Sequence, residues 1–120
     1  MEIYQEIYQT FLTKYNKIET TPSEVGEVLA KLAGVFYNYN MTKIATEKLY
    51  AKVCRDEVLK TDEQTGKATS SSKAQTIADA TQEASDYKTA KGHVENLEMQ
   101  IGVLKFLQKS LEVEYLNSNI

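Results

Sequence analysis

Residues 60–75 read KTDEQTGKATSSSKAQ, and this polar stretch contains no apolar side chain larger than alanine. Such a composition, with Gly66 near its centre, is typical of a turn or an exposed loop. The segments before and after it carry apolar side chains at helical spacing. The fold therefore depends on whether the polar stretch is a linker or the bend between two paired helices.

The N-terminal region predicts one helix and the start of a second. Apolar and aromatic residues recur at three- and four-residue spacing over residues 2–18, which predicts an amphipathic helix there. In ETTPSE (19–24), Thr21 can cap the next helix and Pro22 suits its first position. Glu24 stands where a capping box requires an acidic residue. A second helix is therefore expected to begin at Pro22.

The second helix is predicted to be long. No stop signal follows until Gly66, so we expect it over residues 22–61, roughly 60 Å at 1.5 Å per residue. Gly34 and YNYN (37–40) are the places where it can bend. Such a length exceeds that of ordinary globular helices and indicates a long hairpin or a coiled coil.

A third helix is predicted over residues 72–116, with one of the serines 70–72 as its cap. Its first half is rich in alanine, which allows a partner helix to approach closely. Its second half places Leu97, Ile101, Leu104, Leu111 and Tyr115 at the spacing of a heptad seam. A thicker core is expected at that end.

Two long helices joined by a short polar tip (62–71) fold back antiparallel. We therefore predict one all-α domain over residues 1–120, made of a short N-terminal helix and a long, coiled-coil-like antiparallel hairpin. Segment 29–36 is expected beside 97–111, with the first helix packed at the same end.

The last predicted helix is apolar on more than one face, so it must be covered on more than one side. The first helix can provide this cover, and so can another copy of the chain. We favour a helical homo-oligomer whose candidate interface comprises Leu97, Ile101, Val103, Leu104, Phe106, Leu107, Leu111 and Val113.

Composition and motifs argue against catalysis. With 42% hydrophobic and 26% charged residues and no membrane-length apolar run or leader, the chain is expected to be soluble and cytoplasmic (the host cytoplasm if it is phage-encoded). Cys54 is the only cysteine and His93 the only histidine. TGKATSS (65–71) lacks the first glycine of a phosphate loop. No catalytic residue, metal ligand or cofactor is therefore predicted.

Charge is unevenly distributed. Residues 41–73 hold seven Lys and Arg against five Asp and Glu, although the net charge of the chain is −3. Lys48, Lys52 and Arg55 share one helical face. These basic residues are either an ordinary solvated face or a phosphate-binding patch. The candidate nucleic-acid-binding residues are Lys48, Lys52, Arg55, Lys60, Lys67 and Lys73.

KIATEKLYAKVCRDEVLK (43–60), the glycine-containing polar tip, SSSKAQTIADA (70–80) and HVENLEMQIGVLKFLQKSLEVEY (93–115) together resemble the UvsY-type recombination mediators of T-even phages. The resemblance covers about residues 25–115 and lies in layout. It implies a homo-oligomeric ring that binds single-stranded DNA and helps to load a recombinase. It also implies DNA contacts at Lys48, Lys52 and Arg55 and assembly through 97–111.

Two other classes remain open. One is a protein-interaction module, such as a phage-encoded inhibitor of a host or defence protein, that uses an acidic helical face. The other is an oligomeric binder of a small ligand between subunits. Salt discriminates the first from a DNA-binding protein, because DNA binding collapses as salt rises. A ligand-dependent thermal shift without DNA affinity would identify the second.

Overall fold

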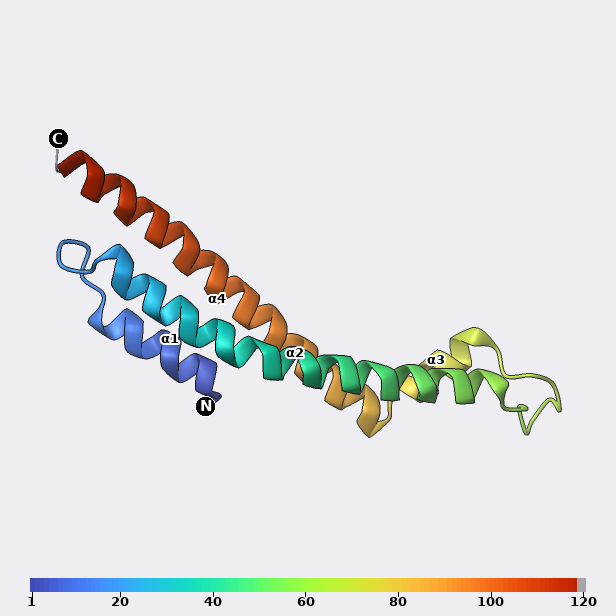
Figure 1. Cartoon of the computed structure of the whole chain (residues 1–120). Coiled ribbons are helices and arrows are strands. Elements are labelled where there is room, and N and C mark those ends of the chain that lie inside the picture. The colour runs from blue at the N-terminus through green and yellow to red at the C-terminus, as the bar shows by residue number, and fades with distance from the viewer. Residues whose placement is uncertain (119–120) are drawn as a thin grey trace. The chain divides into compact units, whose positions relative to one another are not determined.

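The computed structural model describes residues 1–118, and within that range it contains helices and no strand (Figure 1). The helices are α1 (Ile3–Lys14), α2 (Pro22–Leu59), α3 (Ser71–Asp79) and α4 (Gln82–Ser118). The predicted all-α helical hairpin is confirmed. Helix α2 runs without interruption through Gly34 and the YNYN segment.

The chain divides into two compact units. Unit 1 comprises Met1–Asn38 together with Val94–Ile120, and unit 2 comprises Tyr39–His93. Unit 1 therefore contains α1, the first part of α2 and the last part of α4. Unit 2 contains the rest of α2, the loop that follows it, α3 and the first part of α4. The range predicted as one domain, residues 1–120, contains both packing units.

Unit 1 holds the large apolar core. Helices α1, α2 and α4 lie side by side there (Figure 1). The Gln108 side chain on α4 donates a hydrogen bond of 3.1 Å to the carbonyl of Pro22, at the start of α2. Leu29 and Phe36 line the same groove as Ile101, as expected for antiparallel pairing. The buried core side chains are Tyr4, Phe11, Val25, Leu32, Val94, Leu97, Leu104 and Leu111.

The connection between α1 and α2 confirms the predicted cap. The backbone N–H of Glu24 donates to Thr21 Oγ1 at 3.2 Å, and the Thr21 hydroxyl donates to the Glu24 carboxylate at 3.3 Å. Helix α1 ends at Lys14, earlier than the predicted residue 18, because Asn16 and Thr20 close a turn. Asn16 N–H donates to Thr20 Oγ1 at 2.9 Å, and Thr20 N–H donates to the Asn16 carbonyl at 2.8 Å.

Unit 2 is thinner. Its buried apolar side chains are all alanines, at positions 74, 78, 84 and 90. The Tyr50 and Tyr87 rings stack with centroids 5.6 Å apart, and Tyr39 meets His93 edge-on at 5.5 Å. Each pair joins α2 to α4, and the later residue of α2 meets the earlier residue of α4. The two helices are therefore antiparallel in this unit as well, and small residues permit their close approach.

The polar stretch contains a closed, hydrogen-bonded loop. Asp62 N–H donates to the Lys67 carbonyl at 2.7 Å, and Thr69 N–H donates to the Lys60 carbonyl at 3.0 Å. Gly66 has φ +68°, a left-handed conformation that glycine adopts without steric cost. Ser70 caps α3 by accepting from the Lys73 N–H at 3.2 Å. The predicted tip at 62–71 thus corresponds to the loop 60–70, and the predicted cap among serines 70–72 is confirmed.

The helix predicted over residues 72–116 is interrupted, which the sequence reasoning missed. Helix α3 ends at Asp79 and α4 begins at Gln82. Between them, Thr81 Oγ1 donates to the Ala78 carbonyl at 2.6 Å and accepts from the Ala84 N–H at 3.3 Å. One side chain therefore closes the first helix and caps the next. Threonine before the acidic first turn of α4 was the available signal.

Candidate nucleic-acid interface

The clearest basic surface of the chain lies on α2 within unit 2. Lys48, Lys52 and Arg55 are all exposed and share one face of that helix, here called the basic face. None of the ion pairs found among residues 1–118 involves these three side chains. Their charges are therefore available to an external anion.

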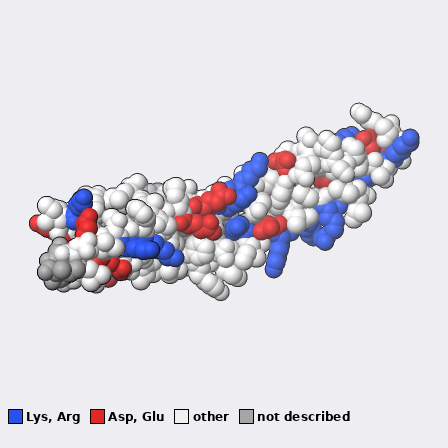
Figure 2. Space-filling model, turned by 90° about the horizontal axis from the view of Figure 1, so that it is seen from above, with Lys and Arg blue, Asp and Glu red and all other residues white. Residues whose placement is uncertain are grey.

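The two units differ in charge. Unit 2 holds nine Lys and Arg against eight Asp and Glu, a net charge of +1, whereas unit 1 holds five against nine, a net charge of −4. Figure 2 shows Lys and Arg side chains, interspersed with Asp and Glu, on the visible face of the molecule. Unit 2 is therefore nearly neutral, and unit 1 carries the acidic excess that disfavours a polyanion.

The basic candidates in and beside the loop 60–70 are less available. The ammonium group of Lys60 lies 2.7 Å from the Glu57 carboxylate, which raises the pKa of Lys60. Lys73 lies 2.8 Å from Asp62, and this hydrogen bond, followed by one from the Gln64 N–H, lowers the pKa of Asp62. Lys67 is exposed and belongs to none of these ion pairs of the described chain. Of the three, Lys67 is the best placed to join the basic face.

Apolar side chains accompany the basic face. Met41, Ile44 and Leu59 are 47%, 37% and 77% exposed. Their spacing along α2 places them on the same side of the helix as Lys48, Lys52 and Arg55. The sequence reasoning missed these residues, although their three- and four-residue spacing was visible. The face therefore combines cationic groups with surfaces that can contact a planar base.

A polar cluster holds α3 against α2. The Tyr50 hydroxyl donates a hydrogen bond to the Asp79 carboxylate, and Gln75 Nε2 donates to both Tyr50 Oη and Asp79 Oδ1 at 2.7 Å. The bond to Asp79 raises the pKa of Tyr50 from 10.0 to about 12 and lowers the pKa of Asp79. This cluster, also missed from the sequence, positions α3 beside the helix that carries the basic face.

The candidate oligomer-interface residues fall into three groups. Leu97, Leu104 and Leu111 are buried inside unit 1, where they serve the core of the single chain. Ile101 and Leu107 are partly buried. Val103, Phe106 and Val113 are 48%, 75% and 51% exposed. These last three, here called the outer stripe, are available to another molecule.

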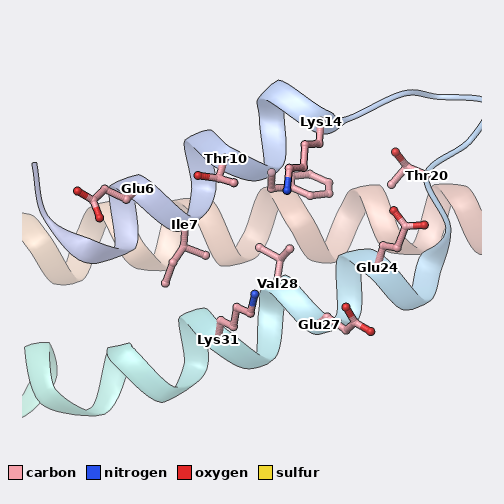
Figure 3. Close-up of a pocket in the computed structure, with 10 residues that line it drawn as sticks. Glu6, Ile7, Thr10, Lys14, Thr20, Glu24, Glu27, Val28 and Lys31 are labelled. Carbon is pink, nitrogen blue, oxygen red and sulfur yellow. The ribbon is translucent and has the colours of Figure 1, made fainter.

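Two grooves of unit 1 differ in chemistry. The α1–α2 groove, shown in Figure 3, is lined by Lys14 and Lys31 but also by Glu6, Glu24 and Glu27, so its charges are mixed. The α2–α4 groove is lined by Leu29, Ala30, Ala33, Phe36, Glu98, Ile101, Gly102 and Lys105. The second groove is therefore mainly apolar, with one acid and one base on α4.

Other kinds of site were sought over the same residues. No helix among residues 1–118 is both long enough and apolar enough to span a membrane. That part of the chain also brings together no group of three or more His, Cys, Asp or Glu side chains able to hold a metal ion. Cys54 is a free, partly buried thiol near Tyr50.

Comparison of the chain with protein-family models, with curated proteins and with solved structures finds no match.

Proposed function

We propose that this protein is a non-enzymatic, self-assembling accessory protein that binds single-stranded DNA through unit 2 and assists recombinase loading. The observation that carries the proposal is the basic face on α2. Lys48, Lys52 and Arg55 are exposed there without an ion-pair partner among residues 1–118. The resemblance in layout to UvsY-type phage mediators supports the recombination role.

The chemistry of the basic face favours a single strand over a duplex. Its cations contact phosphates, which provide affinity without sequence preference. Met41, Ile44 and Leu59 contact bases, which are accessible in a single strand and stacked inside a duplex. The hydroxyl-rich loop 60–70, with Thr65 and Lys67 exposed, supplies further donors to the backbone.

Self-assembly is the second part of the proposal. Three unpaired cations provide only weak binding, so one chain alone is a poor DNA ligand. Several basic faces held together bind one strand with a much higher effective concentration. The outer stripe of Val103, Phe106 and Val113 supports assembly, because a row of exposed apolar side chains is stabilised when another surface covers it.

The test is a fluorescence-anisotropy titration with labelled single-stranded and duplex oligonucleotides at low and high salt. We expect the wild-type protein to prefer the single strand and to lose affinity as salt rises. Lys48→Ala/Lys52→Ala/Arg55→Ala should reduce the slope of log affinity against log salt by about 2 for each subunit on the strand.

The matched control is Lys14→Ala/Lys17→Ala/Lys31→Ala, which removes three charges from unit 1 and produces the same net charge. It should retain most of the affinity, because unit 1 is acidic. Equal losses in the two triple variants would show that net charge alone matters. Absence of binding by the wild-type protein at low salt would overturn the proposal and favour a protein-interaction module.

A further inference from the structure

The α4 side of the α2–α4 groove of unit 1 has symmetrically spaced residues. It is lined by Glu98, Ile101, Gly102 and Lys105. Read in either direction, this row has a charged residue at each end and apolar residues at its centre. The end charges are opposite, and neither Glu98 nor Lys105 takes part in an ion pair of the described chain, residues 1–118.

The α2 side of the groove presents Leu29, Ala30, Ala33 and Phe36, with two small side chains between two large ones. The two alanines are exposed, whereas Leu29 and Phe36 are partly buried. A row with opposite charges at equal distances from its centre can pair with a second copy of itself about a twofold axis.

We propose that the α2–α4 groove is a twofold interface between two copies of this chain, in which the two α4 helices cross antiparallel between Ile101 and Gly102. In that register Glu98 of each copy faces Lys105 of the other, forming two equivalent ion pairs. Ile101 of each copy faces Gly102 of the other, so that a large side chain meets a residue without one. The two pairs of alanines allow the α2 helices to approach.

The position of Gly102 supports this arrangement. Glycine inside a helix costs about 1 kcal/mol relative to alanine. Apart from the adjacent residues and the nearby backbone of α4 itself, nothing lies within 4 Å of the position that a Cβ atom of Gly102 would occupy, so the fold of the single chain does not need a glycine there. Close passage of a partner helix provides a reason, because a Cβ at the crossing point would hold the two backbones apart.

This inference refines the self-assembly in the proposed function and is independent of DNA binding. The test is the molar mass of the protein measured by light scattering across a concentration series without nucleic acid. Glu98→Lys places two lysines opposite each other, and Lys105→Glu places two glutamates opposite each other. Each variant should weaken association at least about tenfold, because like charges then replace two ion pairs.

The double variant Glu98→Lys/Lys105→Glu is the decisive control. It restores both pairs with reversed polarity and keeps the net charge of the wild type, so it should recover the wild-type mass. Helix content measured by circular dichroism should be equal in all four proteins, because both side chains are exposed.

Wild-type mass in either single variant, or no recovery in the double variant, would overturn the twofold interface while leaving assembly itself intact. A wild-type protein that is monomeric at all concentrations would overturn both the interface and the self-assembly in the proposed function. If the wild-type protein associates but does not bind DNA, the DNA-binding part of the proposed function is overturned and the twofold interface is not.

Discussion

At the scale of single residues, the most perturbed group is the Tyr50 phenol. Its hydroxyl donates to Asp79, and its ring stacks on Tyr87, so one side chain of α2 contacts both α3 and α4. Gln75 completes the cluster by donating to the same two oxygens. The cluster is accessible to solvent. The pKa values of Tyr50 and Asp79 are therefore shifted mainly by their hydrogen bond and less by burial.

The first prediction concerns the pH dependence of this cluster. The pKa of Tyr50 is raised to about 12, so its contribution to stability is fully present below its ordinary pKa of 10.0 and is lost as pH rises through about 12. The pKa of Asp79 is lowered, so its contribution is present above the ordinary carboxyl value and is lost in acid as pH falls through the lowered pKa.

The measurement is an ultraviolet titration of tyrosinate. The difference between wild type and Tyr50→Phe isolates this one phenol among eight tyrosines, and its midpoint should lie near 12. In an Asp79→Asn background the same difference should titrate closer to 10.0, because the accepting carboxylate is gone. A midpoint unaffected by Asp79→Asn would show that another group causes the shift.

At the scale of helices, α4 has an inner side and an outer side. Leu104 is fully buried in unit 1, whereas Phe106, two positions further on, is 75% exposed. Helical geometry separates residues two apart by about 200° around the axis, so neighbouring apolar residues serve different surfaces.

The second prediction tests that orientation. Leu104→Ala should lower the free energy of unfolding by about 2–5 kcal/mol, because it leaves a cavity in the core of unit 1. Phe106→Ala should change the same quantity by only about 0.5 kcal/mol. Urea denaturation at low protein concentration, where association contributes least, provides both values. Equal losses would contradict the placement of Phe106 on the outside of the single chain.

Much of the helical architecture could be predicted from the sequence. The Thr21 cap, the long α2 and the antiparallel return follow from local signals, because capping chemistry and apolar spacing act over a few residues. The break at Thr81 was missed because one threonine competes with a continuous apolar pattern. The rest depends on segments that are distant in sequence. The packing of helices such as α1 decides which leucines of α4 are buried. The position of Asp62 decides that Lys73 forms an ion pair.

At the scale of the whole molecule, a unit with a net charge of +1 is combined with an acidic unit whose α2–α4 groove we propose to be self-complementary. The proposed functions of the two units are separate, since the basic face and the groove share no residue. The proposed assembly can therefore be changed without altering the side chains proposed to contact DNA. The variants of the groove then report how far DNA affinity depends on copy number.

The third prediction uses this separation. Glu98→Lys and Lys105→Glu should each lower the apparent affinity for a long single strand by at least about tenfold, because an unpaired chain loses multivalent contact. Glu98→Lys does so although it makes the chain more positive, which excludes a simple charge effect. The double variant should regain wild-type affinity in the anisotropy assay. Higher affinity in Glu98→Lys alone would show that binding depends on charge and not on assembly.

Helix α3 has a further consequence for the dynamics of unit 2. Nine residues are too few for a helix that is stable alone in water. Its order depends on the burial of Ala74 and Ala78, on the Tyr50–Asp79 hydrogen bond and on the Lys73–Asp62 ion pair. Amide hydrogen exchange should therefore reveal α3 as the earliest helix to open, in a local unfolding event that leaves the centres of α2 and α4 protected.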